Sequence, residues 1–321
     1  MNSKINSDQP VVSVLRSLKS WLLNDEAFYS KTEDGDFNNL DYFRLSVFVL
    51  IHLGCLGVFF VGFSWVAVAV AAGLYLLRMF FITAFYHRYF SHKSFSVSRP
   101  MQFAMAVAGC TAGQRGPLWW ASHHREHHIT SDTQADPHSP KYGFLNSHTL
   151  WFLKSSNFPM RKERIKDMLK FPELTFLERI DWLPFIALAG FCLLFGYSIN
   201  KFYPYLGTSA MQMLVWGFFV STVVLYHATY TINSLCHRFG HRRFDTNDDS
   251  RNNFLLALLT LGEGWHNNHH RYPISTRQGF HWWEIDFSYF ILWLMSAIGL
   301  VHNMRPVPVQ VMLEASERKS L

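Results

Sequence analysis

Long apolar stretches separated by polar segments set the pattern of this 321-residue chain. The first runs from about residue 42 to 86 and is softly broken at Val61-Gly-Phe-Ser-Trp65. A membrane-spanning helix takes about 20 residues, so this stretch is too long for one span and suits two. We therefore predict a helical hairpin with spans at about 42–61 and 65–86.

A second apolar pair predicts further spans at about 182–199 and 210–232, joined by a short, nearly uncharged turn. Two more apolar stretches, 101–113 and 287–300, are short or interrupted, and we assign them to buried or interfacial helices. The expected fold is an all-α integral membrane protein with four transmembrane helices in two hairpins.

Composition and charge fit a membrane protein with a sizeable polar part. Hydrophobic residues make up 49% of the chain and charged residues 16%, against about 25% charged residues in a typical soluble protein. The formal net charge of +6 includes no dense run of Lys and Arg, so no nucleic-acid partner is expected. The four cysteines show no C-x-x-C spacing: Cys55, Cys110 and Cys192 are most simply explained as buried thiols, and Cys236 is a weak candidate for a metal neighbour because it lies beside His237.

The distribution of basic residues predicts the orientation. The turns within the two hairpins are nearly uncharged, whereas basic residues flank the hairpins. By the positive-inside rule, both termini and all the histidine-rich segments then lie on the cytoplasmic side. We divide the chain into a polar cytoplasmic N-terminal segment (1–38), a membrane domain (39–305) and a C-terminal tail (306–321). The N-terminal segment has no signal-peptide pattern, and its stretch 11–23 is weakly amphipathic.

Histidines recur in two segments of the form H-x-x-H-H, which are His124-Arg-Glu-His127-His128 and His266-Asn-Asn-His269-His270. Positions i, i+3 and i+4 share one face of a helix, so each segment is predicted to aim three imidazoles at one point. His87 and His92 are five residues apart, which leaves them about 140° apart on an ideal helix. We expect that helix to end or unwind between them.

This number of histidines indicates a metal centre. Imidazole without thiolate suits iron, copper, zinc or nickel, and eight or nine such ligands exceed the coordination number of one ion. We therefore predict two metal ions, held where the second and fourth spans leave the membrane and in the segments that follow. The centre would lie in a cytoplasmic helical cap on the four-helix bundle.

The order of these motifs resembles that of the membrane fatty-acyl desaturases, in particular the stearoyl-CoA Δ9 type. It runs from His87-Arg-Tyr-Phe-Ser-His92 through the first H-x-x-H-H segment and Asn233-Ser-Leu-Cys-His237 to the second. The likeness covers roughly residues 45 to 290 and includes Asp132-Thr-Gln-Ala-Asp136-Pro-His-Ser139 and Gly262-Glu-Gly264.

The resemblance implies an enzyme that uses two iron ions, O2 and two electrons to remove two hydrogens from adjacent methylenes of a long acyl chain, carried on CoA or on a membrane lipid. It also implies a separate electron donor of the cytochrome b5, ferredoxin or rubredoxin type, with its reductase. Asn233 matches a residue that holds a water on one iron. At matching positions the implied iron ligands are His87, His92, His124, His127, His128, His237, His266, His269 and His270.

Ring nitrogens that do not bind metal need hydrogen-bond acceptors. By their place in the sequence, Asp136 and Glu263 are the first candidates, and Glu126, Asp132 and Asp245 are further ones.

An acyl chain also needs an apolar tunnel, which we expect between the second and fourth spans with Trp119 and Trp120 as candidate lining residues. Tyr75 lies twelve residues before His87, or about 18 Å along a helix. Similar desaturases have a bulky residue there, so Tyr75 is the candidate that ends the tunnel and limits chain length.

Several other residues need an interpretation. His123 stands where the family often has an acidic residue, and we do not expect it to bind metal. Arg78 is a charge within the second span, expected either to pair with a carboxylate or to reach the cytoplasmic surface. The electron donor is expected to dock on the basic segment that contains Arg161, Lys162, Arg164 and Lys166. We expect structural hydrogen bonds for His138, His148, His227, His241 and His281, and no particular role for His52 and His302.

Two alternatives remain open. A membrane di-iron hydroxylase acting on a lipid or alkyl chain would use similar ligands, although alkane hydroxylases space their histidines differently. A histidine-rich membrane metal-binding or transport protein belongs to another class, but its ligands would be expected within the spans. The product formed and the metal bound distinguish the three.

Overall fold

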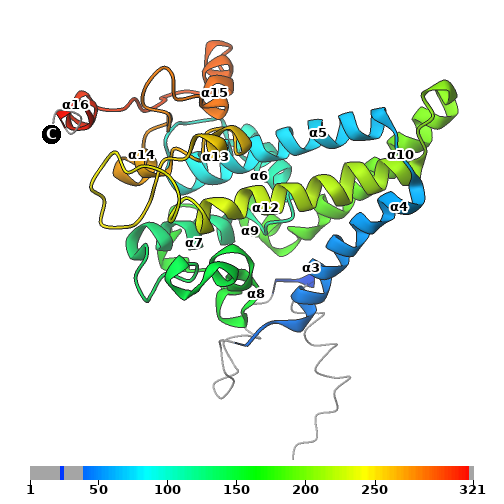
Figure 1. The fold of residues 1–321 in the computed structure, drawn as a ribbon, viewed down its shortest axis with the longest axis horizontal. Coiled ribbons are helices and arrows are strands. Elements are labelled where there is room, and N and C mark those ends of the chain that lie inside the picture. Colours follow the sequence, from blue (N-terminus) through cyan, green and yellow to red (C-terminus); the bar gives the residue numbers. More distant parts are fainter. Residues whose placement is uncertain (1–21, 25–38, 318–321) are drawn as a thin grey trace, which may run out of the picture.

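Helices joined by loops make up the described part of the chain (Figure 1). The structure, a computed structural model, describes residues 22–24 and 39–317. The rest of the N-terminal segment, with most of the amphipathic stretch 11–23, and the last four residues lie outside the described residues. Within that part, β-structure is limited to four isolated bridges. The predicted all-α class is confirmed.

Four helical segments are long and apolar enough to cross a membrane, as predicted. Three of them end a few residues beyond the predicted position, and in the second span the added turn contains Arg88, which is buried against other parts of the protein. The four segments are Tyr42–Val61, Trp65–Ser91, Trp182–Phe202 and Ala210–Ser234.

The first hairpin has a clear start and a tight turn. Its elements are α3 (Tyr42–Gly54), the 3-10 turn η1 (Cys55–Gly57), α4 (Val58–Val61), α5 (Trp65–Phe80) and the π-helix η2 (Phe81–Ser91). Asp41 caps α3 by accepting hydrogen bonds from the backbone N–H groups of Phe43 and Arg44. Gly62 has a φ of 72°, which favours glycine, and Ser64 caps α5.

The second hairpin packs its two helices closely. It comprises α10 (Trp182–Phe202), α11 (Ala210–Met213), the π-helix η8 (Leu214–Val220) and α12 (Ser221–Ser234). A Cβ atom at Gly196 would lie 2.8 Å from the Cα of Ala210, so only glycine permits this approach. The second and fourth spans form the inner pair, with 39% and 44% of their apolar windows buried against 11% and 22% for the first and third.

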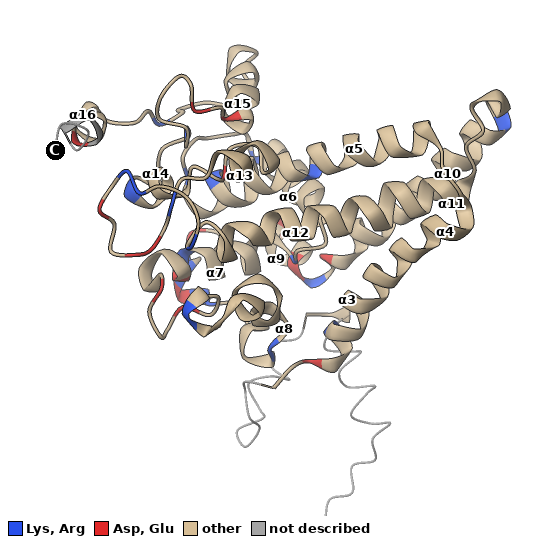
Figure 2. Cartoon of the chain, in the orientation of Figure 1, with Lys and Arg blue, Asp and Glu red and all other residues tan. Residues whose placement is uncertain are grey.

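The remaining helices lie at or beside one end of the bundle (Figure 1). Lys and Arg gather at this end too (Figure 2). Lys201 lies in the last turn of α10, where this helix turns into the short connection to α11. The predicted short apolar stretches become α6 and α15, and neither is long enough to span a membrane. The helices outside the two hairpins are α6 (Arg99–Cys110), α7 (Pro117–Thr130), α8 (Trp151–Leu153), α9 (Pro172–Arg179), α13 (Phe254–Leu259), α14 (His266–Arg271), α15 (Phe287–Ala297) and α16 (Val309–Glu317).

Arg78 follows neither of the two expectations. It is 1% exposed, so it does not reach the surface, and no carboxylate of the described residues pairs with it. Its guanidinium donates instead to the hydroxyls of Ser221 and Thr222 and to the carbonyls of Leu74 and Thr111. These oxygens solvate the charge in place of water, and they tie α5 to α12 and to the end of α6.

Candidate metal centre

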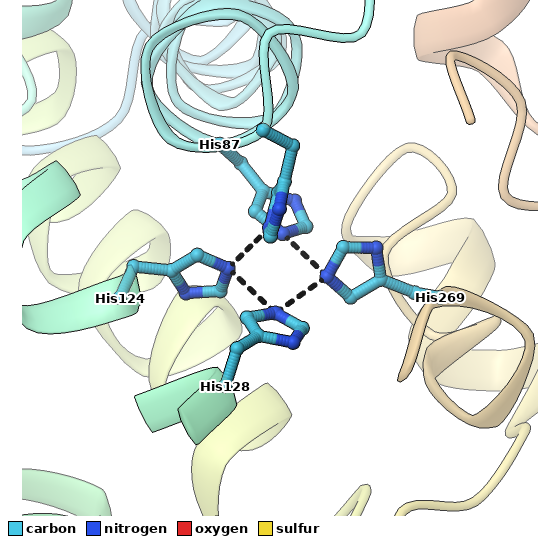
Figure 3. Close-up of side chains that lie close together, drawn as sticks. His87, His124, His128 and His269 are labelled. Carbon is cyan, nitrogen blue, oxygen red and sulfur yellow. Dashed lines mark hydrogen bonds between the residues drawn. The ribbon is translucent and has the colours of Figure 1, made fainter. Parts of the chain in front are cut away.

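Five imidazoles meet between η2, α7 and α14, and we call this group cluster one. They are His87, His92, His124, His128 and His269, with one ring nitrogen each within 4.8 Å of all the others. Figure 3 shows the rings of four of them turned toward a common centre. The Nε2–Nε2 distances are 3.0 Å for His87–His269, 2.9 Å for His269–His128 and 3.1 Å for His128–His124.

Four further imidazoles form cluster two. They are His127, His237, His266 and His270, again within 4.8 Å of one another. The Nε2 atoms of His237 and His266 are 3.0 Å apart. The nine histidines that the resemblance implied as ligands are thus brought together in two groups; their role as ligands stays a prediction.

The division of the H-x-x-H-H segments differs from the prediction. His124 and His128 lie in cluster one but His127 lies in cluster two. In the second segment, His266 and His270 lie in cluster two but His269 lies in cluster one. The prediction that each segment aims three rings at one point is therefore wrong. At 100° per residue, positions i and i+4 point only about 40° apart, whereas i+3 and i+4 point about 100° apart. The pair shares one cluster and the third histidine reaches the other.

His87 and His92 meet without the helix ending between them. The meeting of the two rings and the continuity of the helix both result from the π-helix η2, in which the backbone N–H of His92 donates to the carbonyl of His87 at 3.2 Å. This i→i+5 bond widens the turn, so that positions five apart lie nearly above one another. The ring centroids are 4.9 Å apart. The expected break is a widening of the helix instead.

The spacing of the nitrogens fits metal coordination. At a metal–nitrogen distance of about 2.1 Å, two ligands at right angles lie about 3.0 Å apart. Each Nε2 of His128 and His269 has two neighbours near that distance, and one cation between the rings would satisfy all of them. In cluster two, the Nε2 of His270 is buried with no hydrogen-bond partner among the described residues. Since imidazole suits iron, these residues fit the predicted pair of iron ions.

Carboxylates hold the other nitrogen of four of these rings. In each pair the Nδ1–H faces a carboxylate oxygen, which leaves the lone pair of Nε2 free for a metal. The pairs are His127–Asp136 at 3.1 Å, His237–Asp132 at 2.8 Å, His270–Asp248 at 2.6 Å, and His87–Glu263.

These contacts place the candidate acceptors. Asp136, Glu263 and Asp132 lie where the sequence suggested. Asp248 was missed, because it lies 22 residues before its partner His270 in a segment without a motif. The other two candidates face arginines: Glu126 binds Arg164, and Asp245, whose side chain is 75% exposed, lies 3.8 Å from Arg242.

Glu263 also belongs to a buried charged network. Arg88 donates to Glu263 and, on its other side, to Asp286. Gln278 donates to Glu263 and lies within hydrogen-bond distance of the Nδ1 of His87. The guanidinium between two carboxylates compensates their burial and fixes the carboxylate that orients His87.

The electrostatics favour the neutral form of most of the clustered rings, whereas at His127 the carboxylate of Asp136 outweighs burial and raises the pKa of the ring. Burial, and then neighbouring histidines, lower the pKa of His92, His124, His128, His266 and His269 well below the usual value. Burial acts against ionisation of Asp136, but His138 and His127 outweigh it and hold the pKa of this carboxyl well below its usual range. Neutral imidazoles backed by ionised carboxylates are the form that binds a cation.

Two cavities meet beside the clusters. The first, of about 190 Å³, is bounded by α3, the start of α10, α7, α8 and α12. The second, of about 50 Å³, lies between η2 and α12, that is, between the second and fourth spans. Trp120, His124, Thr229 and Asn233 line both, and Trp119 lines the first. An acyl chain running from one cavity to the other would pass directly beside His124.

Tyr75 and His123 lie apart from the clusters. Tyr75 is one turn before Met79, which lines the second cavity, and its hydroxyl donates to the carbonyl of Leu259 at 2.5 Å. It lines neither cavity, so its predicted role as the end of the tunnel stays a prediction. His123 lines the first cavity and its Nδ1–H donates to the carbonyl of Trp119 at 3.0 Å. It belongs to neither metal-sized group of histidines.

Comparison with known proteins identifies the family. The family model for fatty acid desaturase matches residues 39–295. The chain belongs to the fatty acid desaturase family. It is 38% identical over 279 residues to an acyl-CoA 5-desaturase from Anemone leveillei, covering 86% of this chain and 82% of that one. It is 36% identical to Delta-9 acyl-lipid desaturase 2 from Arabidopsis thaliana (89% and 88%) and 37% identical to an sn-1 stearoyl-lipid 9-desaturase from Anabaena variabilis (80% and 91%).

Membership makes this desaturase an oxidoreductase of lipid metabolism, acting on acyl chains in a membrane environment. Members of the family generally use a pair of iron ions, which agrees with the two histidine clusters. Nine imidazoles would hold the ions, and these would supply the oxidising power needed to break C–H bonds.

Proposed function

We propose that this desaturase introduces a cis double bond, at Δ9, into a long saturated acyl chain carried on CoA or on a lipid. The overall reaction is R–CH2–CH2–R′ + O2 + 2e⁻ + 2H⁺ → R–CH=CH–R′ + 2H2O. The single observation that supports it best is the meeting of two cavities beside both histidine clusters. Relatives that act at position 9 support the regiochemistry.

The protein's part in this reaction is to position the chain. The apolar first cavity would take the carboxyl half of the acyl chain, and the second cavity the methyl half. Trp120 stacks on His124, with ring centroids 5.0 Å apart, and so presents a rigid wall where the two cavities meet. Asn233 lines the same junction, where it would hold a water next to one metal. A fixed chain would expose one pair of methylenes to the metal centre.

The electron donor would be a separate protein of the cytochrome b5, ferredoxin or rubredoxin type, with its reductase. We expect it on the basic segment with Arg161, Lys162, Arg164 and Lys166. Arg125, next to His124, and Lys93, next to His92, both bind Asp167 of this segment. A donor docked there would lie close to Arg125 and Lys93, each of which is adjacent in the sequence to a predicted ligand. With positive-inside orientation, this face and both termini would be cytoplasmic.

Product analysis tests the proposal. The chain and His269→Ala are expressed in a host supplied with saturated fatty acids, and the acyl products are identified by mass spectrometry. His302→Ala, at an exposed position outside both clusters, is the matched control. A new cis-monounsaturated acid that disappears only in His269→Ala supports the proposal. A hydroxy acid would identify a hydroxylase, and no product from iron-loaded protein supplied with donor and acyl carrier would refute it.

A further inference from the structure

Three histidines outside the two clusters form a continuous hydrogen-bonded chain. The Nε2 of His52 is 3.1 Å from the Nε2 of His227, whose Nδ1 is 2.9 Å from the Nε2 of His148. The Nδ1 of His148 is 2.9 Å from the hydroxyl of Ser234. At the other end, the Nδ1 of His52 is 2.7 Å from the carbonyl of Phe48. All six ring nitrogens of the three histidines are thus engaged, although the sequence suggested no role for His52.

The Phe48 end of the chain fixes the order of its protons. A carbonyl only accepts, so the Nδ1–H of His52 donates to Phe48 and its Nε2 must accept. His227 then donates through Nε2 and accepts through Nδ1, and His148 donates to His227. The Nδ1 of His148 accepts from the hydroxyl of Ser234 when that hydroxyl is turned away from the carbonyl of Tyr230, its other partner at 3.1 Å. Every bond is made with three neutral rings. Burial and then His227 lower the pKa of His148 to about 4, in line with a neutral chain.

The chain joins three elements that form the wall of the first cavity. His52 lies on α3, His227 on α12, and His148 in the short helix Asn146–Leu150 that runs directly into α8. These three elements supply Phe48 and Ile51, Tyr226 and Tyr230, and Trp151 and Phe152 to the cavity lining. The histidines therefore hold the wall together from behind the lining residues.

α3 depends on this attachment more than the other spans do. It buries only Arg44 and Ile51 within the protein. Arg44 donates to the carbonyls of Phe152 and Lys154, which fixes the start of the helix. His52, two turns later, makes the next polar bond to the bundle. Arg44 and His52 thus bracket the stretch of α3 that lines the cavity.

We propose that His52, His227 and His148 act as a positioning clasp, which sets the width of the first cavity and thereby the place on the acyl chain where the double bond forms. This inference rests on the proposed function. A chain seated in a cavity of fixed width presents one pair of methylenes to the metal centre, whereas a wall that can move lets the chain shift by one or two carbons. The clasp does not deliver protons, because its far end is closed by the Phe48 carbonyl, which has no proton to pass on.

The test measures the position of the double bond. His227→Phe keeps a ring of similar size but removes both bonds of the middle histidine, while His227→Gln retains one donor and one acceptor. His52→Phe removes the link to α3 alone. His302→Phe is the matched control, since His302 is exposed and its bridge to Ser96 uses only backbone atoms. The positional isomers from each variant are separated and quantified by mass spectrometry.

Loss of one net hydrogen bond corresponds to about a two- to tenfold change in an equilibrium, and we expect a change of that size in the ratio of shifted to main isomers for His227→Phe and His52→Phe. His227→Gln should restore the ratio toward the wild type, and His302→Phe should match it. The double variant His52→Phe/His227→Phe should shift the isomer ratio no further than His227→Phe alone, because residues of one hydrogen-bonded chain have non-additive effects.

The outcomes separate the clasp from the proposed function. If wild-type protein forms no unsaturated product, the proposed function fails. If it does, and the two Phe variants retain iron and give the wild-type isomer ratio, the clasp is refuted. A fall in yield with an unchanged ratio would also refute it, because that result marks a purely structural role.

Discussion

Asp248→Asn is expected to weaken one of the two metal positions and leave the other intact. The carboxylate of Asp248 accepts from the Nδ1–H of His270 through one oxygen, and from the Thr246 hydroxyl and the Ser250 N–H through the other. An asparagine that keeps the two loop bonds must turn its NH2 group toward Nδ1–H. Two donors would then face each other, so His270 would be driven to the tautomer that carries its proton on Nε2, the nitrogen that faces cluster two.

The size of the effect follows from the burial of this pair. The side chains of His270 and Asp248 are 1% and 11% exposed, so water cannot replace the lost acceptor. Removing such a partner of a metal-binding histidine typically lowers metal affinity about 10- to 100-fold, or about 1.4 to 2.7 kcal/mol. Cluster one contains no contact of Asp248 and should keep its metal.

Chelator titration followed by iron analysis measures this difference. Wild-type protein should lose its iron in one step, whereas Asp248→Asn should lose about half at a chelator concentration about 10- to 100-fold lower. Asp249→Asn is the matched control, because the adjacent carboxylate is 48% exposed and makes only long contacts to Lys141 and Arg242. Equal retention of iron in the Asp248 and Asp249 variants would refute the assigned role of the carboxylate.

Three further predictions follow from the structure. Tyr75→Ala should shift product toward longer acyl chains, whereas Leu76→Ala, on the exposed side of the same helix, should not; an unchanged length preference would rule out Tyr75 as the end of the tunnel. Lys166→Glu should raise the KM for the electron donor about two- to fivefold at low salt. Lys201→Glu, in the last turn of α10 within the second hairpin, should leave this KM unchanged, and equal KM values for the two variants would exclude the basic segment as the docking site. Chelator-treated protein should lose stability as the pH falls below about 6.5. Burial lowers the pKa of His123 to about 3, so in this range the unfolded histidine binds a proton that the folded one does not. The free energy of unfolding should fall by about 1.36 kcal/mol per pH unit for each such histidine, and a melting temperature independent of pH from 7.5 to 5.5 would contradict the prediction.

The spans and most of the clustered histidines could be predicted because each depends on local spacing, whereas His237 followed only from the family resemblance. Hydropathy over about 20 residues locates a span whatever surrounds it, and the four spans appear where that pattern placed them. The ends of the helices could not be predicted in the same way. η2 runs on to Ser91 because Arg88 is buried between Glu263 and Asp286, which lie about 180 and 200 residues further along the chain.

Partners that depend on the packing of distant segments were beyond the sequence. Asp248 has no motif, and its role depends on the loop that brings it to His270. His52 carries no signal at all, since a single histidine in an apolar helix is compatible with many environments. Only the packing of α3 against α12 places it beside His227. Arg78 was recognisable as costly, but the hydroxyls that solvate it lie on another span.

The division of ligands between the clusters ties the two halves of the fold together. Cluster one takes four histidines from η2, its C-cap and α7 and one from α14, while cluster two takes one from α7, one from the turn after α12 and two from α14. Neither metal position can therefore form from one hairpin and its following segment. A segment whose three histidines aimed at one point would have allowed two independent sites. Because the middle histidine of each segment lies in the other cluster, α7 and α14 each contribute to both clusters, and docking of α14 against α7 would complete both metal positions.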